Sequence, residues 1–570
     1  MVNTKLLIKI LIYLTIFISL SSITKAKNFN KINNIDNISN YFNGILSLKK
    51  NEYDISYKYL KKLDGLENEH YKFSQYYQFS LITLEKFNEA YKYSKKLENK
   101  KIDSFESNLI SGVYNLKQER YDKAFLNFQK LKKLSKPDTV QGFVSQSLNS
   151  WISFLNVTNV EDALSILDKN SKTFEQITNI QKVFAYCYFD SPKTNTAFKN
   201  LTGNETKKFS RYIYFHANYL LNKKNKKKSI EILQEGIKLF PRNLILNQLN
   251  KDIELGKNFT DKFSCKNLNN VVAEFFFIIS NALASQGGYI SSNLYLILAK
   301  YLNPEFISYN IQYAENFYSL GKKEKAKKIY KRIKKNGEVF DWYASKIIAS
   351  ILIDDKQTKK SLEFLKINFN KIKNPDVYQI YSYADFLKSN EKFKESIQYY
   401  TNVLTLIDKK HELYPKVMHG RGIAFERNGE WEKAEKDFLN SLNALPDQAY
   451  VINYLAYSWI EKGINVKKSL EMLEKANKLR VNDGYITDSL GWALFKLKNF
   501  KEAQKYLELA VRIMPSDPVI NEHYADSLWM NNHLIQARYY WKYVLSLEKV
   551  EKEQKKKLKE KLLFGLKTKI

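Results

Sequence analysis

Two consecutive segments near the C-terminus, Gly484–Asp517 and Pro518–Glu551, are each 34 residues long and carry small and large residues at matching positions. Small residues recur at positions 8 and 20, and large apolar residues recur at positions 7, 11 and 24. A fixed period of roughly 20 to 50 residues is the pattern of stacked structural repeats. The matched residues are Gly491, Ala503, Leu490, Leu494 and Leu507 in the first segment, and Ala525, Ala537, Tyr524, Leu528 and Trp541 in the second.

Each segment predicts two antiparallel helices joined by a short turn. A small side chain where the helices cross lets the backbones approach, and bulky neighbours fill the space around that contact. Pro515, at position 32, cannot continue the second helix and therefore sets the turn into the next unit. Because one such pair leaves an apolar face exposed, the units are expected to stack into a continuous core.

The unit that contains Tyr485, Gly491 and Pro515 resembles the tetratricopeptide-repeat family. The resemblance implies an all-α fold, an α-solenoid wound as a right-handed superhelix. The run from Asn453 to Trp541 is also similar to the end of a bacterial group of exported repeat proteins, which implies an envelope-associated scaffold and no named reaction. The same frame gives about fourteen units, which begin near Asn37, Tyr71, Phe105, Val144, Thr178, Ser210, Ala273, Ile307, Trp342, Val377, Pro415, Ala449, Gly484 and Pro518.

The frame breaks once, over residues 244–272, where Gly256 and the run KNFTDKFSCKN show no pattern of small and large residues. We expect an irregular insertion or a degenerate half-unit there, which divides the array into a block at 27–243 and a block at 273–550. Residues 551–570 are expected to form a capping helix and a basic tail, because the last unit of a solenoid needs a polar cover.

The first 26 residues have the layout of a secretory signal peptide. Lys5 and Lys9 precede an uncharged apolar run, Ile10–Leu20, and small residues, Thr24 and Ala26, stand before the expected cleavage site. The run is short for a membrane-spanning helix, which needs about 20 apolar residues. We therefore predict export to the periplasm or envelope, with an uncleaved signal anchor as the alternative. The later apolar run Val271–Ala284 contains Glu274 and is expected to be a buried helix.

The chain is strongly basic, with 92 Lys and Arg against 60 Asp and Glu, a formal net charge of +32. Such a field attracts nucleic acid or anionic lipid. However, Lys, Asn, Ile, Tyr and Phe are abundant together, as in proteins from AT-rich genomes, and short basic runs such as Lys223–Lys228 are scattered along the chain. We therefore assign most of the charge to solvated helix faces, expect no nucleic-acid partner, and keep an anionic membrane surface as an alternative partner.

The sequence contains few residues that would indicate catalysis or metal binding. None of the six histidines has a second histidine four residues away, and no phosphate-binding or nucleophile-elbow motif occurs. The two cysteines, Cys187 and Cys265, are far apart in sequence; export permits a disulfide between them, but separate buried thiols are commoner within helices. We predict no enzymatic activity, no cofactor and no metal, and leave the pairing of the cysteines open.

In tetratricopeptide repeats, positions 2, 5, 9, 12 and 13 of the first helix face the inner groove where ligands generally lie. In the last three units these positions combine aromatic rings with carboxylates, which would suit an extended or helical peptide that carries apolar and basic side chains. The alternative is that several of these aromatics pack against neighbouring helices. The predicted groove residues are Tyr450, Asn453, Tyr457 and Ile460, then Tyr485, Asp488, Trp492 and Phe495, then Val519, Glu522, Asp526 and Trp529.

These features favour a protein–protein interaction scaffold of the bacterial envelope that binds a protein or peptide in the concave groove. A basic solenoid that binds a polyanion or a membrane surface, in surface-polymer export or assembly, is the alternative function.

Overall fold

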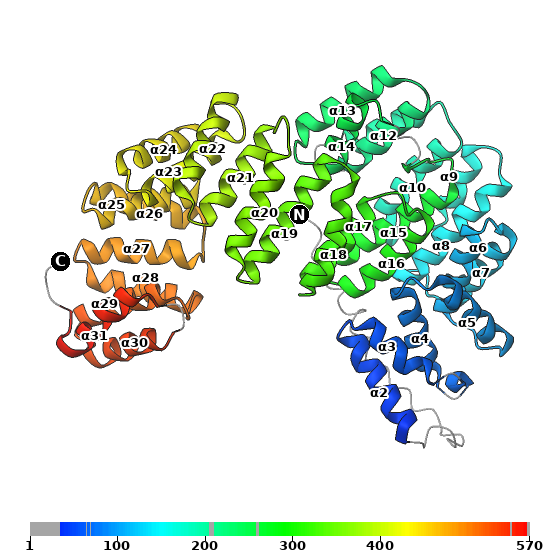
Figure 1. The fold of residues 1–570 in the computed structure, drawn as a ribbon, viewed down its shortest axis with the longest axis horizontal. Helices are drawn as coiled ribbons and strands as arrows, with labels where there is room; N and C mark the ends of the chain where they lie inside the picture. Colours follow the sequence, from blue (N-terminus) through cyan, green and yellow to red (C-terminus); the bar gives the residue numbers. More distant parts are fainter. Residues whose placement is uncertain are drawn as a thin grey trace. The chain divides into compact units, whose positions relative to one another are not determined.

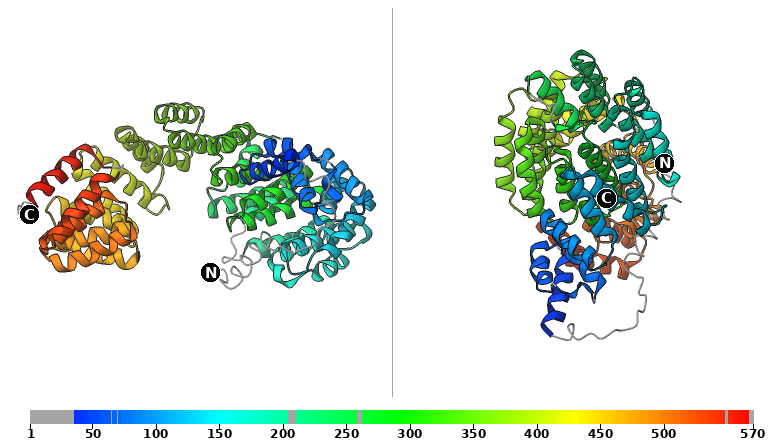
Figure 2. Two further views of the ribbon diagram at one scale, coloured as in Figure 1. Left: turned by 90° about the horizontal axis from the view of Figure 1, so that it is seen from below. Right: turned by 90° about the vertical axis from the view of Figure 1, so that its right-hand side faces the viewer.

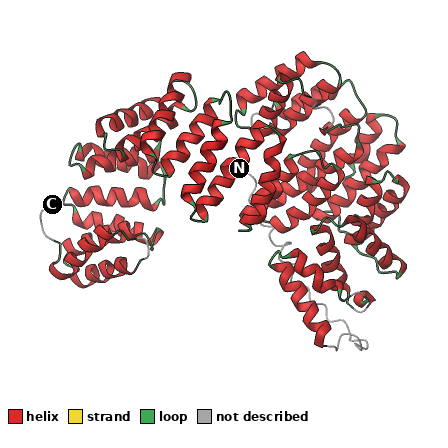
Figure 3. Ribbon diagram, in the orientation of Figure 1, coloured by secondary structure: helices red, strands yellow, loops and turns green. Residues whose placement is uncertain are grey.

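The computed structural model of this chain describes residues 35–63, 65–68, 70–203, 210–257, 262–547 and 550–566. Over these residues the secondary structure is helical and includes no strand (Figure 3). The predicted all-α repeat solenoid is therefore confirmed. The predicted signal peptide, residues 1–26, lies outside the described residues.

The chain forms two compact units, Met1–Asp355 and Lys356–Ile570, and each is described by itself. The unit boundary differs from the predicted break, since residues 244–272 lie inside the first unit. None of the described helices is both long and apolar enough to cross a membrane.

The first unit is built from helices α2 to α19, most of which pack as consecutive pairs (Figure 1). Their bounds are α2 Ile35–Lys49, α3 Tyr53–Lys61, α4 Tyr71–Thr83, α5 Phe87–Asn99, α6 Phe105–Lys117, α7 Tyr121–Leu134, α8 Val140–Ser153, α9 Val160–Asp168, α10 Glu175–Tyr188, α11 Thr194–Thr202, α12 Ser210–Asn222, α13 Lys226–Leu239, α14 Leu244–Glu254, α15 Leu268–Ala284, α16 Tyr289–Leu302, α17 Ser308–Ser319, α18 Lys323–Ile333 and α19 Glu338–Asp354.

The second unit is built from helices α20 to α31 and follows the same pairing. Their bounds are α20 Thr358–Asn370, α21 Val377–Ser389, α22 Phe393–Leu406, α23 Tyr414–Arg427, α24 Trp431–Ala444, α25 Ala449–Glu461, α26 Val466–Leu479, α27 Gly484–Lys496, α28 Phe500–Ile513, α29 Pro518–Met530, α30 Leu534–Ser546 and α31 Lys552–Phe564.

The small residues at position 8 of the repeat lie at the helix crossings, as the sequence predicts. A Cβ atom added to Gly491 would lie 2.7 Å from Leu507 Cγ on the partner helix, and one added to Gly422 would lie 2.7 Å from Phe438 Cε1. Any larger residue would push these helices apart, because cores are close-packed. The close approach of each pair thus depends on the repeat pattern itself.

Helices α15 and α16 pack onto the earlier helices of the first unit: α15 contacts α8 and α10, while α16 contacts α4 and α6 (Figures 1 and 2). The rings of Phe87 and Tyr301 stack with centroids 3.8 Å apart, and Lys300 Nζ lies 2.6 Å from Glu85 Oε1. The sequence assigned α15 and α16 to the start of a second block, but they complete the first one instead. The predicted burial of Val271–Ala284 is confirmed, since this run lies within α15 and most of it is buried.

A buried ion pair anchors α15 to α12. Glu274 is fully buried, and both oxygens of its carboxylate accept hydrogen bonds from Arg211, at 2.5 and 2.7 Å. The guanidinium of Arg211 also lies 3.8 Å from the ring centroid of Phe277. This pair explains how an apolar helix such as α15 can contain a carboxylate.

The segment predicted to be an irregular insertion is largely helical. Helix α14 occupies its first part and contacts α12, α13 and α19. Gln248 Oε1 accepts a hydrogen bond from the backbone N–H of Val339, at 3.0 Å. An irregular insertion is therefore wrong for α14, whose apolar side chains pack in the first unit although its sequence lacks the repeat pattern. The alternative, a degenerate half-unit, is not contradicted by this single helix.

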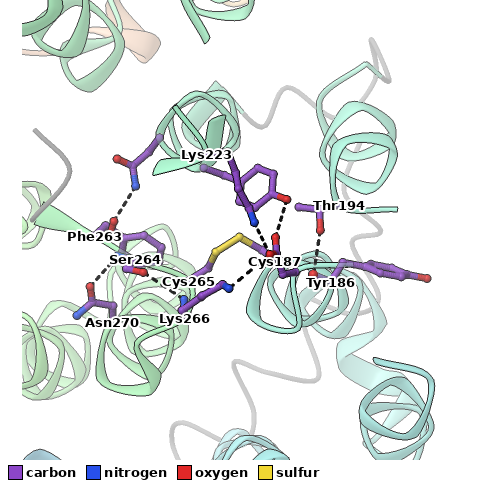
Figure 4. Close-up of a disulfide and its surroundings, with 12 residues drawn as sticks. Tyr186, Cys187, Thr194, Lys223, Phe263, Ser264, Cys265, Lys266 and Asn270 are labelled. Atoms are coloured by element: carbon purple, nitrogen blue, oxygen red, sulfur yellow. Dashed lines mark hydrogen bonds and ion pairs between the residues drawn. A yellow bond between two sulfur atoms is a disulfide. The ribbon is translucent and has the colours of Figure 1, made fainter. Parts of the chain in front are cut away.

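Cys187 and Cys265 form a disulfide, with Cα atoms 5.9 Å apart across a sequence separation of 78 residues (Figure 4). Cys187 lies near the end of α10, and Cys265 precedes α15. The sequence left this pairing open; the superhelix returns α15 to the side of α10 and so brings the two sulfurs together.

Candidate binding surface

The predicted groove residues of the last three units lie on α25, α27 and α29, and they differ widely in exposure. Tyr450 and Tyr485 are 48% and 55% exposed, so their rings are accessible. Asn453 and Tyr457 are half-buried. The hydroxyl of Tyr450 donates to Asp483 Oδ2 at 2.9 Å, which fixes this ring near the start of α27.

Asp488 and Trp492, which the sequence placed in the open groove, are buried in a network between α27 and α29. The Asp488 carboxylate lies 3.0 Å from His523 Nδ1, and the His523 ring stacks on Trp492 with centroids 3.9 Å apart. Trp492 Nε1 donates to Glu461 at 2.6 Å. Burial opposes the charge on His523, but Asp488 outweighs it and raises the pKa of His523. Ile460 and Phe495, which were also predicted to line the groove, are buried.

The carboxylates of α29 are covered by the chain's own C-terminal helix, α31. Lys561 Nζ lies 2.6 Å from Asp526 Oδ2 and 2.7 Å from Glu522 Oε1. Gln554 donates to Glu522 at 2.7 Å, and Trp541 Nε1 donates to Asp526 at 2.8 Å. Burial disfavours the charge on Lys561, but the two carboxylates outweigh it and raise the pKa of Lys561.

Trp529 is covered from the same side. Gly565, the residue after α31, approaches the Trp529 ring so closely that a Cβ atom could not be added without displacing it. The guanidinium of Arg538 lies 4.8 Å from the Trp529 ring centroid. The expectation that Glu522, Asp526 and Trp529 line an open groove is therefore wrong, because α31 occupies that place.

A hollow lies instead on the first unit, among α15, α17 and α19. Its volume is about 420 Å³, which is within the range of small-ligand sites. Counted from Ala273 and Ile307, several lining residues occupy groove positions 9, 12 and 13 of their repeats. The lining residues are Asn281, Ala284, Ser285, Tyr289, Gln312, Glu315, Asn316, Tyr318, Ser319, Tyr330, Tyr343 and Ile347.

Glu315 is the one carboxylate that lines this hollow. The hydroxyl of Tyr343 donates to Glu315 Oε1 at 2.5 Å. Among the described residues, no Lys, Arg or His forms an ion pair with Glu315. Burial raises the pKa of Glu315 above its usual value, although the bond from Tyr343 opposes that effect. The Glu315 carboxylate in turn raises the pKa of Tyr343, in addition to the effect of burial.

The sequence contained the signal for this hollow, but the groove prediction did not use it. Glu315 and Tyr318 fall at positions 9 and 12 of the unit that begins at Ile307, so the same rule selects them. The rule was applied only to the last three units, whose repeat pattern is clearest. Within the described part of the chain, no group of three His, Cys, Asp or Glu side chains is placed to hold a metal ion.

Comparison with known proteins identifies the repeat. Profiles of the tetratricopeptide repeat match residues 311–336 and 489–517. The chain contains tetratricopeptide repeats. A TPR repeat-containing protein of Pseudomonas aeruginosa is 25% identical over 139 residues, which cover 24% of this chain and 22% of that protein. The chain thus spans about a fifth of the length of the curated relative that it matches.

Solved structures of repeat proteins are also similar to parts of this chain. A tetratricopeptide repeat protein from Parabacteroides merdae matches 39% of this chain and 85% of its own, with 17% identity and a TM-score of 0.32. PilF of Pseudomonas aeruginosa matches 31% of this chain and 81% of its own, with 15% identity and a TM-score of 0.28.

The tetratricopeptide repeat at 311–336 contains Glu315, Tyr318 and Tyr330, three of the residues that line the hollow. The hollow therefore lies on a recognised repeat unit. The second matched repeat contains Trp492, whose ring is buried against His523.

Proposed function

We propose that this chain is an exported scaffold of the bacterial envelope that binds a partner protein on the concave faces of its tetratricopeptide repeats. Such repeats generally mediate protein–protein interactions, and their conserved positions serve packing, so the scaffold role rests on the repeats themselves. The partner segment we propose is a peptide or helix that carries basic and apolar side chains.

The seating of α31 supports this partner chemistry. α31 is a basic helix, and it lies against a groove that contains both aromatic rings and carboxylates. Lys561 neutralises two buried acids, and Leu558 is fully buried. Because the chain's own segment on this surface combines a lysine with an apolar side chain, a partner for the remaining concave surface should combine the same features.

The disulfide supports the proposed export. Disulfides persist in oxidising compartments such as the bacterial periplasm and are rare in the cytosol. The chain contains two cysteines, Cys187 and Cys265, and the fold joins them. The layout of residues 1–26 supports the same compartment independently.

Export can be tested by fractionating cells that produce the full chain and a variant that lacks residues 2–26. We expect the full chain in the periplasmic or envelope fraction, with both thiols protected from alkylation until a reductant is added. The truncated variant should stay in the cytosol with reactive thiols. Full-length chain in the cytosol, with free thiols, would contradict the proposal.

Partner binding can be tested by crosslinking and affinity capture from envelope fractions, with mass spectrometry to identify captured proteins. A reproducible partner that crosslinks to concave-face residues such as Tyr450 or Tyr485 would support the proposal. A matched variant with Tyr450→Ser and Tyr485→Ser should capture less of it. Capture that is equal for both variants would place the partner elsewhere.

A second candidate function is polyanion binding, favoured by a hollow of about 450 Å³ on α5 and α7. Four lysines line it, with Glu98 as the one acid, and two of the lysines pair with that acid. Binding to vesicles that contain anionic lipid should weaken steeply with salt if this hollow contributes, whereas indifference to salt argues against it. The lining lysines are Lys95, Lys123, Lys130 and Lys133.

A further inference from the structure

We propose that the hollow around Glu315 binds an alkylammonium group, the end of a lysine side chain supplied by the partner protein. The inference deepens the proposed function, on which it rests, by naming the chemical group that one part of the concave face recognises.

Glu315 has no cationic partner among the residues that the structure describes. Its carboxylate is half-buried, and the one hydrogen bond it accepts comes from a neutral hydroxyl, that of Tyr343. Removing a carboxylate from water costs free energy unless an opposite charge compensates it. Beside this carboxylate the structure has a hollow of about 420 Å³. An incoming cation would therefore gain an electrostatic partner that is already partly desolvated.

The walls of the hollow also favour a cation. The rings of Tyr289, Tyr318, Tyr330 and Tyr343 all line it. Aromatic faces attract ammonium groups through their quadrupole, and several rings around one position form a cage. Gln312 donates its amide to Asn316 at 3.0 Å, which leaves the Gln312 carbonyl oxygen as an acceptor for an ammonium N–H.

The chain itself shows how such a site is filled. Asp526 stands at position 9 of its repeat, as Glu315 does of its own. Asp526 is buried and accepts a hydrogen bond from a neutral donor, Trp541 Nε1, at 2.8 Å. The cation that completes this second site is a lysine, Lys561, 2.6 Å away. At Glu315 the neutral donor is present and the lysine is not.

The equivalent site at Asp526 favours lysine over arginine, because the cation that completes it is the single ammonium of Lys561. A compact ammonium needs one oxygen and uses its other N–H groups on neutral acceptors. A single carboxylate is too few ligands for calcium, which takes six to eight oxygens.

The test titrates the full chain with Nα-acetyl-lysine N-methylamide and follows binding by ligand-observed NMR. Matched probes are the norleucine analogue, which lacks the ammonium, and the Nε-acetylated analogue, which lacks the charge. We expect saturable binding of the lysine probe, and neither matched probe should bind. Glu315→Gln should weaken binding by at least about tenfold, whereas Glu305→Gln, which changes an exposed carboxylate of the same unit, should leave it unchanged.

Tyr318→Leu supplies a second variant in case Glu315→Gln changes the fold, which circular dichroism would reveal. It removes a ring from the wall and keeps the carboxylate, so binding should weaken by about threefold or more. No saturable binding of the lysine probe to the natural chain would overturn the proposal, and so would equal affinity for the natural chain and both pocket variants.

Two further measurements complete the test. The first identifies the source of the ammonium group, and the second distinguishes failure of the lysine assignment from failure of the proposed scaffold function. Cadaverine tests a free diamine: tighter binding of cadaverine than of the lysine probe would overturn the protein source. Partner capture with Glu315→Gln tests the link to the scaffold role. If the lysine probe binds but no partner is captured, the site stands and the scaffold function fails. If a partner is captured equally well by Glu315→Gln, the scaffold function stands and the lysine assignment fails.

Discussion

Two carboxylates at the same position of the repeat have different surroundings. Asp526 on α29 lies 2.6 Å from Lys561 of α31, and Trp541 donates to it. Glu315 on α17 accepts one bond from Tyr343, forms no ion pair with a described residue, and lines an open hollow. In these two units the repeat supplies an acid together with a neutral donor, whereas the cation comes from a separate segment. At α29 that separate segment is α31 of the same chain, which supplies Lys561.

Glu274, at position 2 of the unit that begins at Ala273, is the most deeply buried acid of this kind. Its cation, Arg211, comes from α12. The three acids form a series in how far a cation compensates their negative charge. Glu274 and Asp526 each have a cation, whereas Glu315 has none among the described residues. This series can be tested by removing the cations of Glu274 and Asp526 and by removing the charge of Glu315.

The largest effect is expected from Arg211→Met. It leaves the fully buried Glu274 without its cation and removes the guanidinium from the ring of Phe277. The free energy of local opening of α12 and α15 should fall by about 4 kcal/mol. Hydrogen exchange, read by mass spectrometry on peptides from these helices, measures it.

The matched control is Lys238→Met on α13, an exposed lysine of the same unit. It should change local opening by less than about 0.5 kcal/mol. A loss below about 1 kcal/mol in Arg211→Met would mean that the pair adds little, and the series would lose its first member.

Lys561→Met comes next, with an expected loss of about 3 kcal/mol in the opening free energy of α29 and α31. Two acids, Glu522 and Asp526, lose their shared cation. The loss should shrink toward pH 4, because protonation removes the charges that lack a partner. Lys557→Met, which changes a largely exposed lysine of α31, is the control and should have little effect. Equal exchange in both variants would contradict the role given to Lys561.

A structural feature could be predicted from the sequence when the residues that determine it lie close together along the chain. The crossing residues Gly422 and Gly491 were readable because a repeat encodes its own helix pair within 34 residues. The Cys187–Cys265 disulfide and the docking of α15 were not, because they depend on curvature accumulated over many units. A capping helix was expected from the basic run at the end, but its contact with Asp526 was not.

Tyr343→Phe should have a smaller effect. The substitution removes the one hydrogen bond donor to Glu315 and leaves the ring in place. We expect the opening free energy of α17 and α19 to fall by about 1.5 kcal/mol, the cost of leaving a half-buried acceptor without its donor. Tyr289→Phe, on the same hollow, is the control and should fall within about 0.5 kcal/mol of the natural chain. If both variants behave alike, the Tyr343 hydroxyl contributes nothing specific.

Glu315→Gln should have the smallest effect and the opposite sign. Burial raises the folded-state pKa of Glu315 above the value of 4.5 for a free side chain, so the ionised group destabilises the fold at neutral pH. Removing its charge should therefore stabilise α17 at pH 7, by less than the loss expected from Tyr343→Phe. Below the unfolded-state pKa both states bind the proton, so the gain should disappear as the pH falls below 4.5. Added lysine probe should also reduce the gain, because it stabilises only the ionised natural chain. A gain that is the same at pH 4 and pH 7 would show that a cation already compensates the charge of Glu315. Glu315 would then resemble Asp526, which is paired with Lys561.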